Sequence, residues 1–229
     1  ETRLQVMKEL GRADTAQSFM WVIRGGPPQN PVILYRYHPS HSAKIPLVYL
    51  SNYQGYLQTD GYEAYADVGA LEGITHVGCW AHARRKFDEA AKPSNTPGSA
   101  QEALGRIAKL YRIERELRAE RLEPQQFACK RRQQVLPILT DFKQWLEQKA
   151  AQVPPSTLLG KAVSYALGEW EKLVRYLDSP YLSPDTNGVE NAIRPFVLGR
   201  KNWLFSGSPR GAHASATLYS LIETAKANG

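Results

Sequence analysis

Cysteine, long apolar runs and, near the end of the chain, acidic residues are scarce in these 229 residues. The two cysteines, Cys79 and Cys129, argue against a disulfide framework and favour a reducing compartment. No segment approaches the roughly 20 apolar residues that span a bilayer, and the charged opening around Glu1 and Arg3 shows no signal peptide. We therefore expect a cytoplasmic protein with no membrane partner. The first residue is not methionine, which suggests a piece of a longer protein.

Acidic residues are absent from positions 191–210, immediately after a single carboxylate, Glu190. Over the whole chain, 29 Lys and Arg outnumber 22 Asp and Glu, and the net charge is +7. This charge favours an acidic partner, of which nucleic acid is the commonest, while a basic enzyme with scattered cations remains the alternative. The residues of this stretch that could contact phosphate, sugar or base are Arg194, Arg200, Lys201, Asn202 and Trp203.

Five short runs of β-forming residues in the first third of the chain predict a mixed sheet. A Gly/Pro link between the second and third runs favours an antiparallel meander. A short helix is predicted over 43–50 and a helical crossover over 62–70. The predicted strands are Leu4–Met7, Phe19–Ile23, Val32–Tyr37, Tyr56–Thr59 and Ile74–Cys79.

The middle of the chain, from about residue 98 to 150, predicts an all-helical insertion, because it is rich in Arg, Glu, Leu, Gln and Ala. Apolar residues recur there at helical spacing from Val135 to Leu146. Pro137 falls within this pattern, either inside a helix or at the start of one.

Two further helices are predicted near the end of the chain. Ser156 is expected to cap an amphipathic helix whose apolar stripe runs from Leu159 to Leu177. A last helix is expected to begin near Ser208 and Pro209. Its apolar face would consist of Ala214, Leu218, Leu221, Ile222 and Ala225.

Two acids stand in settings that suggest chemistry. Asp60 follows a short predicted strand, and an acid at the carboxyl end of a strand projects into the crevice where such sheets bind ligands. The alternative is that Asp60 and Gly61 only form a turn. Glu190 is predicted in the first turn of a short helix, where an acid can simply compensate the helix dipole. A turn or cap role is expected for the nearby Asp185.

Cys79 and His82 are spaced like half of a zinc site, but no second ligand pair follows. We instead expect a strand followed by the start of a helix, with His82 turned towards the end of the sheet. The neighbouring cations are expected on the solvent-exposed face of that helix, where they either contact DNA or are only solvated. These are Arg84, Arg85 and Lys86.

Five motifs together resemble the catalytic region of the insertion-sequence sixty-six family of bacterial transposases, in the right order and over nearly the whole chain. The resemblance implies a mixed α/β fold, an RNase-H-like core with a five-stranded mixed sheet flanked by helices. It places the two parts of that core at residues 1–97 and 151–229, around a helical insertion at 98–150. The motifs are LQTDGYEAY, CWAHARRKF, PDTNGVENAIRP, GRKNWLFSGSPRGA and LYSLIETAKANG.

The resemblance also implies a three-acid site that cuts and joins DNA with two Mg²⁺ or Mn²⁺ ions. Asp60 and Glu190 match the second and third acids, as catalytic residues and metal ligands, and His82 would orient the scissile phosphate. The first Asp is expected immediately before Glu1 and is not in the sequence, so the chain as given is expected to be impaired unless that residue lies outside it. Glu1 is not expected to replace it, because neighbouring residues on a strand face opposite sides.

The partners that the resemblance implies are DNA, as transposon ends and target, a second copy in a synaptic homodimer, and companion proteins of the element. Two alternatives stay open: another metal-dependent DNA nuclease with the same fold, and a DNA-binding remnant without catalysis.

Overall fold

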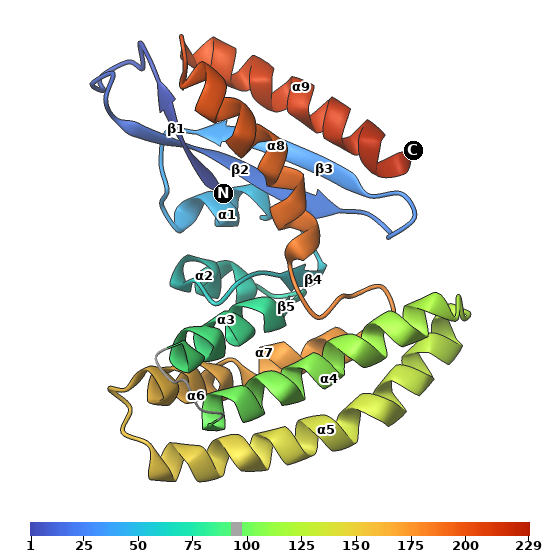
Figure 1. Cartoon of the computed structure of the whole chain (residues 1–229). Coiled ribbons are helices and arrows are strands. Elements are labelled where there is room, and N and C mark those ends of the chain that lie inside the picture. Colours follow the sequence, from blue (N-terminus) through green and yellow to red (C-terminus); the bar gives the residue numbers. More distant parts are fainter. Residues whose placement is uncertain (93–97) are drawn as a thin grey trace. The chain divides into compact units, whose positions relative to one another are not determined.

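The computed structural model describes residues 1–92 and 98–229 (Figure 1). They form two compact units, residues 1–51 with 187–229 and residues 52–186. The first unit is therefore discontinuous in sequence. The boundary expected at residue 97 falls within 93–97, which lie outside the described residues, and the division at 97 and 150 stays a prediction.

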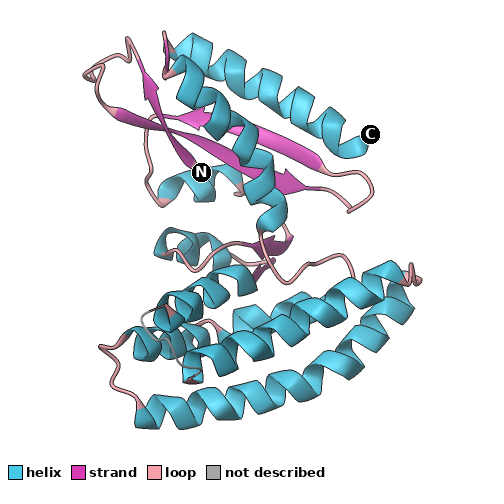
Figure 2. Ribbon diagram, in the orientation of Figure 1, coloured by secondary structure: helices cyan, strands magenta, loops and turns pink. Residues whose placement is uncertain are grey.

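The first unit is built on a four-stranded sheet in the order β3-β2-β1-β6 (Figure 2). The predicted meander is confirmed, since β1, β2 and β3 pair antiparallel, and β6 adds parallel to β1. The elements of this unit are β1 (Thr2–Val6), β2 (Gln17–Gly25), β3 (Val32–His38), α1 (Lys44–Tyr49), α8 (Asn187–Trp203), β6 (Phe205–Ser206) and α9 (Pro209–Asn228).

One face of this sheet is buried beneath α8 and α9. In β3, Ile33, Tyr35 and Tyr37 are buried, whereas the alternating Val32 is 44% exposed, as expected for a strand with one face on the core. Phe196 of α8 is fully buried in the same apolar cluster. The sheet therefore buries its apolar side chains against helices from the opposite end of the chain.

The last helix begins where the sequence predicted, at Pro209, with the Ser208 hydroxyl accepting a hydrogen bond from the Gly211 N–H at 3.2 Å. It covers the edge strand β3, because Ser220 and Thr224 hydroxyls accept hydrogen bonds from backbone N–H groups of that strand at 2.8 and 2.9 Å. The buried residues of α9 are Ala212, Ala216 and Glu223. The apolar face predicted for this helix is exposed: Ala214, Leu218, Leu221, Ile222 and Ala225.

The second unit joins a two-stranded parallel sheet to a helical region with an aromatic core. Trp80, Phe142 and Trp170 lie at its centre, with ring centroids 5.8–6.0 Å apart. The elements are β4 (Gly55–Gln58), η1 (Glu63–Tyr65), α2 (Ala66–Gly69), β5 (Ile74–Val77), α3 (Trp80–Ala91), α4 (Ser99–Ala119), α5 (Pro124–Gln152), α6 (Leu158–Gly168), α7 (Trp170–Val174) and η2 (Arg175–Asp178).

All five predicted strands form, and the mixed α/β class is confirmed, without conflict with an RNase-H-like core. The strands do not make the single five-stranded sheet that was expected. Among the described residues, three of them share a sheet with β6, while β4 and β5 pair with each other. Strand β6 was not predicted, because two residues are too few to show an alternating pattern.

The helical stretch that was predicted as one element after Ser156 is broken in the structure. It consists of α6, α7 and η2, with the break at Gly168 and Glu169, and glycine is a poor helix former. The cap is Thr157, whose hydroxyl accepts from the Gly160 N–H at 3.0 Å. Pro137 lies inside α5 and does not start it.

Candidate active site

Asp60 lies two residues after Gln58, the last residue of β4, at the carboxyl end of the strand. Its Oδ1 accepts a hydrogen bond from the Tyr62 backbone N–H at 3.1 Å, which is the turn geometry that an Asp-Gly pair favours. The side chain is nevertheless 37% exposed. One carboxylate oxygen therefore serves the turn while the group stays accessible, so the turn role and a ligand role are compatible.

The turn after Asp60 is held closely by α6. A Cβ on Gly61 would overlap the hydroxyl of Tyr165, so glycine is needed for this approach. Burial raises the pKa of Tyr165 to about 12, and the phenol is therefore neutral at physiological pH. The position of the Asp60 carboxylate is thus supported by the packing of a neutral aromatic side chain.

His82, which was expected to turn towards the end of the sheet, lies beside this carboxylate. It belongs to the first turn of α3, and its Nε2 is 3.8 Å from Asp60 Oδ2. Its other ring nitrogen, Nδ1, is 3.1 Å from the Cys79 Sγ. The hydrogen bond with Cys79, followed by the charges of that thiol and of Asp60, raises the pKa of His82 against the opposing effect of burial. The imidazole is thus oriented through one nitrogen and presents the other to Asp60.

Cys79 is fully buried and serves as a hydrogen-bonding centre. Its sulfur accepts a hydrogen bond from the Thr186 N–H at 3.3 Å and lies 3.2 Å from the Thr186 hydroxyl. Burial raises the pKa of the thiol, but the hydrogen bonds from His82 and Thr186 outweigh burial, and the net shift is downward. Asp60, His82, Cys79 and Thr186 therefore form one polar chain.

A cavity of about 240 Å³ is lined in part by Asp60. It is lined in part by Tyr62, His76 and Lys172. Burial, followed by the charge of Lys172, lowers the pKa of His76, whose Nε2 is 2.7 Å from the Thr59 hydroxyl. The cavity therefore places polar groups next to the candidate catalytic carboxylate.

Glu190 lies in the first turn of α8 and is partly buried. The helix was expected to be short, but it has 17 residues and continues through Pro195 into the basic stretch. Glu190 belongs to the first unit, whereas Asp60 belongs to the second. In the two described ranges, no group of three or more His, Cys, Asp or Glu side chains is arranged to hold a metal ion.

The predicted DNA-contacting residues of α8 differ in their surroundings. Arg194, Lys201 and Asn202 are exposed. The Arg200 Nη1 donates a hydrogen bond to the Thr2 hydroxyl at 3.0 Å. Trp203 is partly buried and packs edge-on against Phe196, at 5.3 Å between ring centroids. The contact of Trp203 is thus with the core, and its proposed contact with a base stays a prediction.

The predicted basic triplet lies on the surface of α3. Arg84, Arg85 and Lys86 are exposed, and the Lys86 ammonium lies 5.9 Å from the centre of the Tyr165 ring. These cations are on the same helix as His82, which follows from their spacing. Their exposure is compatible both with DNA contact and with simple solvation.

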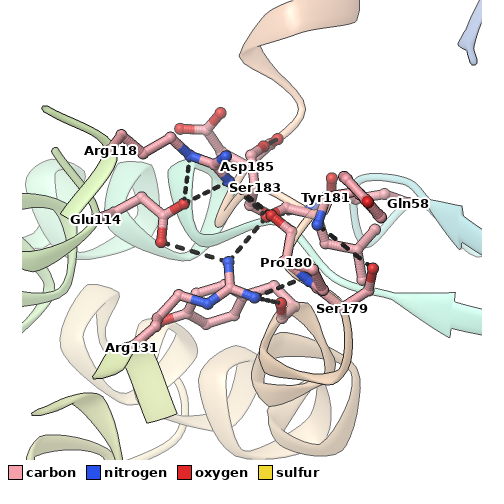
Figure 3. A network of polar contacts seen from close by, with 11 residues as sticks. Gln58, Glu114, Arg118, Arg131, Ser179, Pro180, Tyr181, Ser183 and Asp185 are labelled. Carbon is pink, nitrogen blue, oxygen red and sulfur yellow. Dashed lines mark hydrogen bonds and ion pairs between the residues drawn. The ribbon is translucent and has the colours of Figure 1, made fainter. Parts of the chain in front are cut away.

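Residues 179–186, which we call the strap, complete this site, and their contacts were not predicted from the sequence. The strap is anchored at Ser183, whose carbonyl accepts from Gln58 Nε2 at 2.8 Å, and at Pro184, whose carbonyl accepts from the Trp80 N–H at 2.9 Å. Gln58 and Ser183 are both seen in Figure 3. Thr186 then bonds Cys79. The strap is therefore hydrogen-bonded to the end of β4 and to the start of α3.

One signal could have revealed the partners of the strap. Arg131 on α5 is fully buried and lies four residues before Val135, on the same apolar stripe that predicted the helix. A charged residue within such a stripe is rare unless it is paired, and it therefore marks a buried polar network.

Comparison with known proteins identifies the family. Residues 1–214 match the family described as Transposase IS66 family. The chain belongs to this transposase family. It is 34% identical over 208 residues to uncharacterized protein y4jD of Sinorhizobium fredii. The aligned region covers 88% of this chain and 40% of the relative.

A second relative from the same organism, uncharacterized protein y4qI, is 32% identical over 231 residues, covering 96% of this chain and 42% of the relative. The chain thus spans about two fifths of the length of these relatives. No solved structure matches the chain. None of the helices in the described part of this transposase-family chain has the length and apolar character needed to cross a membrane.

Proposed function

We propose that this chain is the catalytic region of a transposase that cuts transposon ends and joins them to target DNA by metal-dependent phosphoryl transfer. Membership of the IS66 transposase family supports the class of reaction. The observation that carries the site is the accessible carboxylate of Asp60 at the end of β4, 3.8 Å from His82. A strand-end acid beside a histidine of raised pKa fits a phosphoryl-transfer site.

Glu190 is proposed as the second carboxylate of this chain. It follows Thr186 by four residues, a length of chain that spans at most about 14 Å. Thr186 is bonded to Cys79, which is bonded to His82. The covalent chain therefore limits how far Glu190 can lie from the Asp60 cluster, and this limit supports a shared site.

The donor set fits Mg²⁺ or Mn²⁺, because both ions prefer carboxylate oxygens. Asp60 and Glu190 would hold two ions, which when bound stabilise charge on the attacking and leaving oxygens. Asp60 can offer Oδ2, since its Oδ1 already accepts the Tyr62 N–H. His82 would donate a hydrogen bond to a phosphate oxygen, in the orientation that its contact with Cys79 fixes.

The DNA would be held by cations of both units, together with Asn202 and Trp203 of α8. Lys and Arg contacts to phosphate position a duplex without reading its sequence. A homodimer that brings two transposon ends together, and companion proteins of the element, belong to the same proposal. The contributing residues are Arg84, Arg85, Lys86, Arg194, Arg200, Lys201, Asn202 and Trp203.

The test is strand cleavage of labelled transposon-end DNA in Mg²⁺ or Mn²⁺, measured on the chain extended at its start by the Asp that the family motif places before Glu1. Asp60→Asn and Glu190→Gln should each abolish cleavage while the dissociation constant for DNA stays within about twofold, because neither change removes a cation. Cleavage that persists in either variant would refute the assigned role.

Two matched controls separate the loss of a metal ligand from the loss of an acid. Asp67→Asn removes an exposed acid from α2, near Asp60 in sequence. Glu171→Gln removes an exposed acid from the first turn of α7, the position in the helix that Glu190 has in α8. Both should cleave normally. Cleavage without strand transfer would instead favour a nuclease, and DNA binding with neither activity would favour a non-catalytic module.

A further inference from the structure

The helical insertion contacts the strap through two arginines (Figure 3). Arg131 of α5 donates from Nη1 to the Leu182 carbonyl at 3.0 Å, and from Nη2 to the carbonyls of Tyr176 and Ser179 at 2.8 and 2.7 Å. These carbonyls lie in η2 and in the irregular strap that follows it. The guanidinium thus supplies the donors that such backbone acceptors need when they are buried.

Arg131 is fully buried, and its surroundings hold it in one orientation. Its guanidinium lies 4.8 Å from the centre of the Phe127 ring and 5.3 Å from that of Tyr176. Glu114 of α4 provides the countercharge, with Oε2 at 3.5 Å from Arg131 Nη1. Burial of a cation costs free energy unless its N–H groups donate hydrogen bonds. The network therefore stabilises the fold only while the strap carbonyls stay in place to accept them.

Arg118 of α4 extends the same network to the solvent. Its Nη2 donates to the carbonyls of Pro180 and Leu182 at 3.3 and 3.1 Å, and its Nε donates to Glu114 Oε1 at 2.9 Å. Its side chain is 40% exposed. Arg118 is therefore a position where the network can be weakened without opening a cavity in the core.

The far end of the strap lies in the candidate active site. Thr186 bonds Cys79, which orients His82 towards Asp60. The next residue, Asn187, begins the helix that carries Glu190. An ordered strap therefore fixes the contact behind His82.

We propose that Arg118, Arg131 and Glu114 make the helical insertion a clamp, whose function is to order the strap and so to position His82 for catalysis. The three are positioning residues, since they act on the site through the strap. The catalytic consequence rests on the proposed function, whereas the ordering of the strap does not.

The test compares Arg118→Met with Arg106→Met by amide hydrogen exchange and by cleavage rate. Arg106 is the matched control, because it lies on the same helix, pairs with Asp141 and Glu102, and packs on Trp145, but makes none of the contacts with the strap. Both variants should remain folded, since both side chains are partly exposed. Arg118→Lys keeps the charge but not the forked donors.

Arg118→Met should speed exchange of the amides in residues 179–186 by tenfold or more, while those of α9 stay unchanged. The cleavage rate at saturating DNA should fall by roughly 10- to 100-fold, as expected for a misplaced catalytic group, with unchanged affinity for DNA. Arg118→Lys should recover part of both effects. Arg106→Met should leave strap exchange and cleavage as in the unmodified chain.

Unchanged exchange in the strap of Arg118→Met would overturn the clamp, whether or not the chain cleaves DNA. Faster exchange with an unchanged cleavage rate would overturn the positioning role and leave only structural packing. If the unmodified chain itself does not cleave, the proposed function fails, and the exchange experiment still decides whether the insertion orders the strap.

Discussion

Two polar clusters in residues 52–186 use charge in opposite ways. In the cluster of Arg131, Glu114 and Arg118, a fully buried cation donates to three carbonyls and faces a carboxylate. In the cluster of Asp60 and His82, the carboxylate is 37% exposed and the charged groups stay 3.8 Å apart. The first cation is buried away from solvent, whereas the second cluster keeps a carboxylate that a ligand can reach. A buried charge with a countercharge indicates a scaffold, whereas a carboxylate that stays accessible can take part in chemistry.

The largest effect should come from removing the buried cation. Arg131→Ala leaves three carbonyls without that donor and Glu114 without one of its two arginines, so the free energy of unfolding should fall by about 3 kcal/mol or more. Urea denaturation followed by circular dichroism measures this change. Lys130→Ala is the control, because the adjacent Lys130 forms an exposed ion pair with Glu120 and should cost at most about 0.5 kcal/mol. Equal losses in the two variants would contradict the comparison.

A smaller loss is expected where the Asp60 turn meets α6. Gly61→Ala would drive a Cβ into the Tyr165 hydroxyl, which should cost about 1–3 kcal/mol, as overpacking generally does. Combining it with Tyr165→Leu should restore part of the loss if the clash is the cause. Thermal unfolding of the single and double variants decides this, and purely additive losses would rule out the contact.

Asp60→Asn should change stability by less than about 1 kcal/mol while abolishing cleavage. The asparagine Oδ1 can still accept the Tyr62 N–H, so the turn is preserved. Asp60→Asn should therefore lose cleavage without losing stability, whereas a change at Arg131 is expected to lower stability itself. A loss of several kcal/mol in denaturant unfolding would instead make Asp60 a structural residue.

The smallest effect concerns His76, beside the cavity next to Asp60. Burial, followed by the charge of Lys172, lowers the pKa of His76 from its ordinary value of 6.5, so the folded chain binds this proton less readily than the unfolded chain. Stability due to the neutral ring is complete above about pH 6.5 and is lost as the pH falls below it. The free energy of unfolding between pH 7.5 and pH 5 should fall less in His76→Gln. The exposed His213→Gln is the control, and an unchanged slope in His76→Gln would exclude the effect.

The sequence predicted the strands, the position of Asp60 and the start of α9 because each depends on local signals: alternation, an Asp-Gly pair and a capping serine before proline. It could not predict which face of α9 is buried. Periodicity favoured Leu218 and Leu221, but the helix binds an edge strand through Ser220 and Thr224, whose hydroxyls satisfy backbone N–H groups. Hydrogen bonds to the strand therefore decide which face of α9 is buried, more than the apolar area of that face does.

The strap and its arginines were missed for a similar reason. Residues 179–186 have no periodic pattern, and their structure comes from donors that are distant in sequence, such as Arg131 and Gln58. Contacts of this kind become visible only after folding. The helix after Thr157 is broken at Gly168, just before the buried Trp170. The apolar stripe continues across this break, so the spacing of apolar residues predicted one helix.

The central claim, that Asp60 and Glu190 act on shared divalent ions, is tested most directly by a crystal structure of the chain soaked with Mn²⁺. The account predicts anomalous density for Mn²⁺ within about 2.2 Å of carboxylate oxygens of both residues, as expected for metal–carboxylate bonds. Density that touches only one of the two acids, or neither at saturating Mn²⁺, would contradict it.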